Sequence, residues 1–179
     1  MTDTLGLTPS QTSGPYLSIG LLRDLVPSVL VDATDPRAIR IHGRLLDGAG
    51  DGVPDGLVEI WHADEEGRYE KGGFHGFGRS GTEDDGRFEF VTVKPGPVPA
   101  PDGGLQAPHI AVGIVARGLL KRVVTRLYFP DEAEANAVDP VLSRLAPEQR
   151  ETLVAVSDDR GLRFDIRLQG AAQTTFFAV

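Results

Sequence analysis

A single histidine, His109, at the start of an apolar run is the clearest sign of chemistry in this 179-residue sequence. Two histidines at positions i and i+2 of a strand project to the same side and can hold one metal ion. Here the second position is Ala111. Tyr69 follows an earlier apolar run, and as a phenolate it could bind a hard cation such as ferric iron. One histidine and one tyrosine do not complete a four- or five-coordinate site.

Both residues also have ordinary structural interpretations. A lone histidine at a strand start is more often a hydrogen-bonded structural residue than a ligand, and a surface tyrosine covers an edge with its ring. The other histidines, His42, His62 and His75, form no pair at i,i+2 or i,i+4 spacing. A site assembled from separate strands stays open as an alternative. The pattern is typical of a metal-binding segment that has lost part of its ligand set.

Basic residues gather in one stretch of an otherwise acidic chain. The formal net charge is -8, yet Arg117, Lys121, Arg122 and Arg126 lie close together. We expect Arg122 to be a surface residue that forms ion pairs with nearby acids. Arg117 lies in a turn, A-R-G, between two predicted strands. There its planar guanidinium is well placed to reach across an edge and bind a carboxylate in a bidentate manner.

The composition is that of an ordinary globular protein and excludes several classes of function. Hydrophobic residues make up 40% and charged residues 25%, and the length suits one domain. The negative charge argues against nucleic-acid binding, which requires a basic face. The absence of cysteine excludes disulfides, thiolate metal sites and a cysteine nucleophile.

No apolar run approaches the roughly 20 residues of a membrane helix, so no membrane association is expected. The first residues carry neither the basic region nor the apolar region of a secretory signal. We therefore expect a cytoplasmic protein.

Alternating apolar and polar residues predict strands from Arg37 onward. In R-A-I-R-I-H-G-R-L-L, Ile39 and Ile41 share one face and His42 lies on the other. Phe88 and Phe90 share a face after an Asp-Gly turn. Residues 162–168 alternate as one further strand. Other strands are predicted in G-L-V-E-I-W-H-A, H-I-A-V-G-I-V-A and R-V-V-T-R-L-Y-F.

Helix signals are confined to residues 131–153, where acidic residues and Pro147 stand at first-turn positions. Residues 1–36 contain one short apolar stretch and predict an extended N-terminal arm with a single turn of helix. Such an arm docks on a partner or on its own domain. About eight short strands with a small helical insert predict an all-β fold, an antiparallel β-sandwich over residues 37–179.

Eight short segments in a fixed order carry a resemblance that extends over nearly the whole chain. They are T-P-S-Q-T-S-G-P-Y at 8–16, V-E-I-W-H-A-D at 58–64, G-R-Y at 67–69, V-K-P-G-P-V-P at 93–99, A-P-H-I at 107–110, A-R-G at 116–118, T-R-L-Y-F-P-D-E at 125–132 and R-F-D-I-R-L-Q-G at 163–170. Through these segments the sequence resembles the intradiol ring-cleavage dioxygenases.

The resemblance implies a remnant of an iron site. In iron-bearing members of that family, two tyrosines and two histidines hold ferric iron. Tyr69 matches the first tyrosine and His109 the first histidine, whereas Val98 and Ala111 stand at the second tyrosine and the second histidine. Gln106 stands near a position where the catalytic chain carries an arginine. The resemblance thus implies that this chain binds no metal and has no catalytic residue of its own.

The resemblance also implies a partner. In these enzymes the active site lies at an interface in a hetero-oligomer, with Fe(III) on a homologous β chain. The iron-free chain lines the substrate pocket with its arm and an arginine, here Thr12, Gly14, Pro15, Tyr16 and Arg117. Tyr16 either contacts the substrate or only anchors the arm. The implied reaction is cleavage of a small aromatic acid, 3,4-dihydroxybenzoate, by O₂ to 3-carboxy-cis,cis-muconate.

Two other functions are compatible with a sandwich of this kind. A non-catalytic binding module would be a stable monomer with an exposed aromatic groove, which is not evident from 7% aromatic residues. A self-sufficient iron enzyme would recruit ligands elsewhere, such as His62 or His75, and would retain iron when purified alone.

Overall fold

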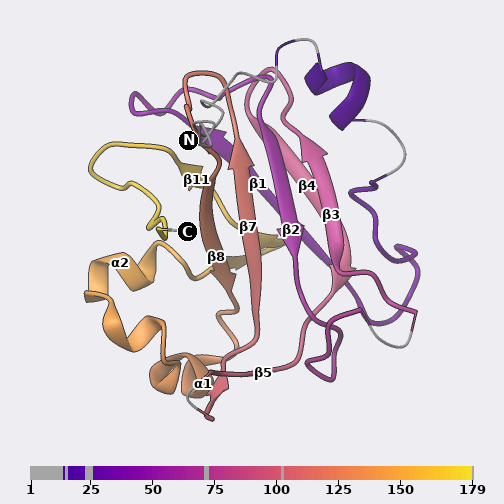
Figure 1. Cartoon of the computed structure of the whole chain (residues 1–179), viewed down its shortest axis with the longest axis vertical. Helices are drawn as coiled ribbons and strands as arrows, with labels where there is room; N and C mark the ends of the chain where they lie inside the picture. The colour runs from indigo at the N-terminus through magenta and orange to yellow at the C-terminus, as the bar shows by residue number, and fades with distance from the viewer. Residues whose placement is uncertain (1–13, 15, 23–25, 71–72, 102, 179) are drawn as a thin grey trace, which may run out of the picture.

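The computed structural model describes residues 14, 16–22, 26–70, 73–101 and 103–178. These residues form two β-sheets packed face to face, with the short helices of residues 133–151 toward one end and that of residues 17–21 at the other (Figure 1). The predicted β-sandwich is confirmed. Within the described residues the chain forms eleven strands, against about eight predicted, because several strands are only two or three residues long.

The first sheet is built around β1, which spans Ala38–Leu46. It pairs antiparallel with β4 (Arg87–Val93) but parallel with β10 (Gly161–Arg163) and β11 (Ile166–Arg167), and β9 (Val156–Asp158) pairs with β10. The two C-terminal strands therefore differ from the antiparallel prediction. They follow a long connection through the second sheet, and such a connection can return the chain to β1 in its own direction.

Residues 162–168 form two short strands in place of the single predicted one. Between them, the backbone N–H of Arg44 donates to Asp165 Oδ1 at 3.0 Å, so a side chain replaces a strand-to-strand hydrogen bond. Gly43 lies against this break, because a Cβ atom there would lie 2.0 Å from the carbonyl oxygen of Phe164. Phe164 and Ile166 are buried, as the alternation predicts.

The second sheet is antiparallel and has the strand order β3-β2-β7-β8. A two-stranded hairpin lies beside it, formed by β5 and β6. The bounds are β2 Leu57–Trp61, β3 Phe77–Gly81, β7 His109–Val115, β8 Val123–Tyr128, β5 Val98–Pro99 and β6 Leu105–Gln106.

The main core lies between the two sheets. Phe88 and Phe90 of β4 are both buried, as predicted, and they face inward residues of β2 and β7 such as Ile60 and Ile110. A smaller cluster around Tyr128 packs β8 against the helical segment. That segment lies where the sequence predicts it, with Pro147 as the first residue of its last helix. Its elements are α1 Ala133–Val138, η2 Leu142–Arg144 and α2 Pro147–Glu151.

The described part of the N-terminal arm docks on its own domain. The single turn of helix predicted there is η1, a five-residue π-helix at Leu17–Leu21. Further along, the N–H of Leu30 donates to the carbonyl of Val91 at 2.8 Å, and the N–H of Arg79 donates to that of Pro27 at 3.2 Å. Residues 27–30 thus join β4 of one sheet to β3 of the other. The boundary between arm and sandwich at residue 36 remains a prediction.

His42 lies on the expected side of β1, opposite Glu89 and Arg163. It is nevertheless buried, because the β9–β10 hairpin brings Asp158 beside it, with Oδ1 3.0 Å from His42 Nε2. In the part of the chain that the structure describes, no helix is long and apolar enough to cross a membrane. The cytoplasmic location remains a prediction.

Candidate functional site

Three of the four residues predicted to belong to a lost metal site, Tyr69, His109 and Ala111, lie at the outer face of the β3-β2-β7-β8 sheet, and Val98 lies in the β5–β6 hairpin beside it. Directly opposed residues of neighbouring strands share a face. Phe77, Trp61, Ala111 and Arg126 therefore form one row across the four strands, since Phe77 pairs with Trp61, Trp61 with Ala111, and Ala111 with Arg126. His109 starts the next row, opposite Tyr128.

Tyr69 reaches this face from the loop after β2. Its ring stacks on that of Trp61, with the ring centroids 5.6 Å apart, and 38% of the residue is exposed. Burial raises the pKa of Tyr69, although the cation of Arg126 acts in the opposite direction. The hydroxyl therefore stays protonated at neutral pH, as a neutral phenol.

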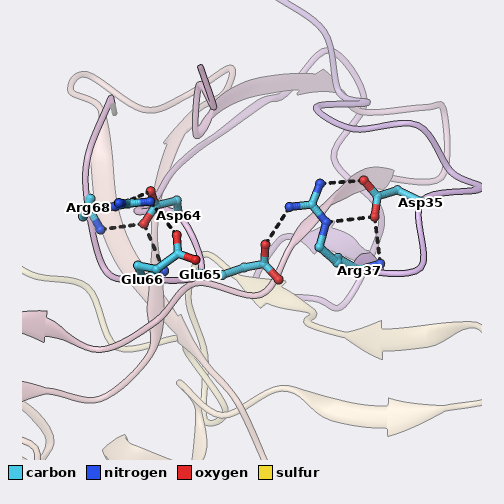
Figure 2. Close-up of polar contacts among 6 residues, drawn as sticks. All are labelled: Asp35, Arg37, Asp64, Glu65, Glu66 and Arg68. Atoms are coloured by element: carbon cyan, nitrogen blue, oxygen red, sulfur yellow. Dashed lines mark hydrogen bonds and ion pairs between the residues drawn. The ribbon is translucent and has the colours of Figure 1, made fainter. Parts of the chain in front are cut away.

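Asp64 organises the loop that carries Tyr69 (Figure 2). Its Oδ1 accepts the backbone N–H groups of Glu66 and Arg68 at 3.0 and 2.8 Å, and its Oδ2 accepts Nε of Arg68 at 2.9 Å. Arg37 donates to both Asp35 and Glu65 and so ties the start of the sandwich to the same loop. The loop is held by its own backbone and by charge-assisted bonds.

Two glycines allow the Tyr69 loop to touch the loop that carries Val98. A Cβ atom on Gly67 would lie 2.0 Å from the carbonyl oxygen of Pro97, and one on Gly96 would lie 2.3 Å from that of Glu65. Gly67 also has a φ of 75°, which side chains rarely adopt. The structure thus brings the four predicted positions to one end of the sheet.

Val98 is buried at the start of β5, opposite Gln106 of β6. Its side chain offers no donor atom, and neither does that of Ala111. Two of the four positions are therefore hydrocarbon.

His109 keeps the arrangement of a neutral histidine with one available lone pair. Its Nδ1 lies 2.8 Å from the carbonyl oxygen of Ala107, which can only accept, so Nδ1 carries the hydrogen. Burial, reinforced by the cation of Arg126, lowers the pKa of His109 to about 4. The hydrogen-bonded structural role expected for a lone histidine at a strand start is confirmed.

His62 belongs to the interior and is not available to a metal. Its Nδ1 lies 2.7 Å from the carbonyl oxygen of Ala63, and its Nε2 lies 2.8 Å from the hydroxyl of Thr92. Both ring nitrogens are occupied. Among the residues that the structure describes, no three His, Cys, Asp or Glu side chains gather as a metal site would require.

Arg126 is the residue at this face whose role the sequence does not reveal. Its Nη1 donates to Gln106 Oε1 at 2.7 Å and to the hydroxyl of Tyr128 at 3.2 Å. The Tyr128 hydroxyl in turn donates to Asp139 Oδ1 at 3.2 Å. Alternation along β8 does place Arg126 on the same face as Tyr128. By contrast, Arg122 pairs with Glu59 at 3.2 Å, so the ion pair predicted for it is confirmed.

These residues do not fit ferric iron. Iron(III) requires several anionic or neutral donor atoms, and the four ligand positions offer only one lone pair, on His109, and one protonated phenol, that of Tyr69. The guanidinium of Arg126, which has donors only, faces both groups. No step of chemistry at a metal is therefore assigned to this chain.

Arg117 lies at the other end of the same sheet. It follows β7 by two residues, and the strand separates Val115 from His109 by roughly 20 Å. The predicted turn is confirmed. Arg117 is exposed and forms no ion pair or hydrogen bond with another described residue. Leu120, in the same turn, is 81% exposed.

The arm reaches the sheet at this end too. Leu57 pairs with Gly81 on one side and Val115 on the other, and the side chain of Leu22 lies against Gly81. Figure 1 shows η1 and the β7–β8 turn at the same end of the molecule.

Tyr16, at the start of η1, is 66% exposed. Gly14 has a φ of 53°. Thr12 and Pro15 lie outside the described residues, so the pocket roles of all five arm and turn positions remain predictions.

Comparison with known proteins agrees with this arrangement. A family model described as Dioxygenase matches residues 24–170. The chain is 41% identical to the protocatechuate 3,4-dioxygenase alpha chain of Burkholderia cepacia, covering 98% of this chain and 99% of that one. This chain belongs to the intradiol dioxygenase family.

Further members of the intradiol dioxygenase family support the same conclusion. The alpha chain from Pseudomonas putida is also 41% identical, with 98% of each chain covered. The beta chain from B. cepacia is 32% identical over 76% of this chain and 66% of its own length. A solved dioxygenase domain from a Streptomyces sp. SirexAA-E fusion protein is 29% identical, with a TM-score of 0.64 over 93% of this chain and 100% of that one.

Replacement of Gly67 by alanine tests whether the two loops of this intradiol dioxygenase depend on backbone contact. Gly67→Ala introduces both a strained φ and a clash with Pro97, whereas Gly73→Ala introduces only the strain, since its φ is 82° and no atom lies within 4 Å. We expect Gly67→Ala to lose about 2 kcal/mol more of the free energy of unfolding than Gly73→Ala. The fluorescence of Trp61, the only tryptophan, should change in Gly67→Ala alone. Equal losses in both variants would contradict the contact.

The buried His62 predicts a specific loss of stability in acid. Burial lowers the pKa of His62 from 6.5 to about 4, so the unfolded chain binds a proton more readily. The stabilisation is complete above pH 6.5 and is lost as the pH falls towards 4. Between pH 7.5 and 5, the free energy of unfolding measured in urea should therefore fall by about 2 kcal/mol more in wild type than in His62→Gln. The stability of His75→Gln, which changes an exposed histidine, should depend on pH as that of wild type does. A His62→Gln variant with the pH dependence of wild type would show that His62 is not the source of the acid sensitivity.

Proposed function

We propose that this chain is the α subunit of a protocatechuate 3,4-dioxygenase and forms a hetero-oligomer with a homologous, iron-bearing β chain. One observation carries the proposal. The chain matches two alpha chains over almost all of its length, while two of the four iron-ligand positions of the family hold valine and alanine. The similarity covers the turn at Arg117 as well as the sandwich.

The similarity to a beta chain supports a paired assembly. A chain that is 32% identical to this one would fold in the same way, and two such chains can associate about a pseudo-two-fold axis. Leu120 and Ile19 present apolar side chains to solvent, with 81% and 57% of each residue exposed. A partner that covers these side chains removes apolar surface from water.

Arg117 would bind the substrate carboxylate. A chain with a net charge of -8 repels an anionic substrate at long range, so a local cation is needed to capture it. Arg117 is exposed and has no ion-pair partner among the described residues, which leaves its planar guanidinium available to bind a carboxylate. The arm, with Thr12, Gly14, Pro15 and Tyr16, would close the pocket beside it.

The proposed reaction is the intradiol cleavage of 3,4-dihydroxybenzoate by O₂ to 3-carboxy-cis,cis-muconate. Fe(III) on the β chain supplies the oxygen chemistry when bound there. The residues of this chain bind and orient the aromatic acid and exclude water from the pocket.

The two alternatives have less support. A monomeric binding module does not explain a match to alpha chains that extends from end to end. A self-sufficient iron enzyme would need replacement ligands, yet His62 uses both ring nitrogens inside the protein.

Expression of the chain with and without an iron-type β chain tests the assignment. We expect the lone chain to be colourless and free of iron, and the coexpressed complex to be coloured and to consume O₂ with 3,4-dihydroxybenzoate. The measurements are iron per chain, visible absorbance and oxygen uptake. A lone chain with stoichiometric iron and a tyrosinate-to-iron absorption band would refute the proposal, as would a failure of the two chains to associate.

Replacement of Arg117 by alanine in the active complex tests its role with the carboxylate. We expect kcat/KM for 3,4-dihydroxybenzoate to fall about 10- to 100-fold, as for the loss of a charge-assisted hydrogen bond. The value for catechol, which lacks the carboxylate, should stay nearly unchanged. Lys121→Ala removes an exposed charge from the same turn without removing the guanidinium, and it should affect neither substrate. Equal losses for both substrates in Arg117→Ala would contradict carboxylate binding.

A further inference from the structure

Arg126 is a cation in an unusual setting. It is half-buried on the outer face of the sheet, and no carboxylate of a described residue forms an ion pair with it. Its neighbours on the face are neutral: the amide of Gln106, the phenol of Tyr128 and the ring of His109. The nearest link to an acid passes through the Tyr128 hydroxyl to the fully buried Asp139.

Arg126 lies beside the ligand remnants. It stands directly opposite Ala111 of β7, and His109 lies two residues before Ala111 on that strand. Its hydrogen-bond partner Gln106 pairs with Val98 across the β5–β6 hairpin.

The fourth remnant, Tyr69, approaches Arg126 from the loop side. Its ring stacks on Trp61, which stands in the same row of the sheet as Ala111 and Arg126.

We propose, on the basis of the proposed function, that the guanidinium of Arg126 is a built-in cation that replaces ferric iron at this face. It joins β8 to the β5–β6 hairpin through Gln106 and keeps a metal ion out. In this view the loss of two ligands and the presence of Arg126 are separate barriers to metal binding.

Two physical properties suit an arginine to this role. A guanidinium remains charged at every relevant pH and is more weakly hydrated than an ammonium group, so it tolerates partial burial. It also has five N–H donors and no acceptor, so it can use the oxygens of Gln106 and Tyr128 but cannot coordinate a cation. A trivalent ion placed beside it would meet a positive charge at short range in a poorly solvated setting.

Restoration of the missing ligands therefore should not restore metal binding by itself. The experiment compares Val98→Tyr/Ala111→His with the triple variant Val98→Tyr/Ala111→His/Arg126→Gln, using the full chain without its partner. Glutamine removes the charge and keeps an amide that can hydrogen-bond to Gln106. The probe is ferric iron, and the readouts are iron per chain and a tyrosinate-to-iron absorption band. Arg126→Gln alone serves as the control with two ligands missing.

We expect about one iron per chain and a visible band in the triple variant, and neither in the double variant or the control. Binding by the double variant with an affinity equal to that of the triple variant would overturn the inference, because Arg126 would then be no obstacle. Binding by neither would overturn it equally, because removal of Arg126 would not have opened the site.

A milder pair of variants covers the case in which the buried Val98→Tyr change prevents folding. Ala111→His creates an i,i+2 histidine pair with His109, and Ala111→His/Arg126→Gln adds the loss of charge. We expect the second variant to bind Co²⁺ at least about tenfold more tightly, as for removal of a nearby like charge. Equal affinities would overturn the inference.

The hydrogen bonds of Arg126 also predict a change in stability. Arg126→Gln should lower Tm by several degrees, whereas Arg122→Gln, which changes a half-exposed arginine directly before β8, should lower it less. An unchanged Tm in Arg126→Gln would show that Arg126 does not hold the hairpin. None of these measurements involves the partner, so they can fail while the coexpressed complex forms and cleaves its substrate.

Discussion

The antiparallel register of β2, β7 and β8 is the constraint on which the rest of the molecule depends. A shift of one residue would turn Ile60, Ile110 and Ile114 out of the core, so the buried side of the sheet fixes the register firmly. The same register decides what meets on the outer side. It sets Ala111 opposite Arg126 and His109 opposite Tyr128, without any need for those residues to attract one another. The hydrophobic core thus specifies the geometry of a face that contributes little to the core.

This separation explains how a metal site can lose its ligands while its scaffold persists. The loops that carry Tyr69 and Val98 are held by Asp64 and by the backbone contacts at Gly67 and Gly96. None of these interactions requires a metal. The hydroxyl of Tyr128 is buried and needs hydrogen-bond partners, because buried polar groups without partners are costly. Arg126 of β8 donates to this hydroxyl and to the half-buried amide oxygen of Gln106.

The sequence predicts the parts of the fold that depend on local pattern. Alternation locates β1 and β4, and acidic residues with Pro147 locate the helical segment. The parallel pairing of β10 and β11 with β1 is beyond local pattern, because it depends on a connection from Leu46 to Gly161 that takes up most of the chain. Arg122 and Arg126 illustrate the same limit within the candidate site. Arg122 directly precedes β8 and Arg126 lies within it, and alternation places both on the same side. Only their partners, Glu59 for Arg122 and Gln106 for Arg126, distinguish their roles.

The outer face of the sheet separates Arg117 from the remnants of the iron site. Arg117 and the described part of the arm lie at one end of the sheet, and the ligand remnants lie at the other, with most of β7 between them. A substrate the size of a dihydroxybenzoate, less than about half the length of that strand, cannot touch both ends. If Arg117 binds the substrate carboxylate, as we propose, the metal that acts on the same substrate must be held elsewhere than at His109. A homologous chain docked at the Arg117 end would supply that metal, and the loss of iron ligands from this chain would then leave the proposed shared site intact.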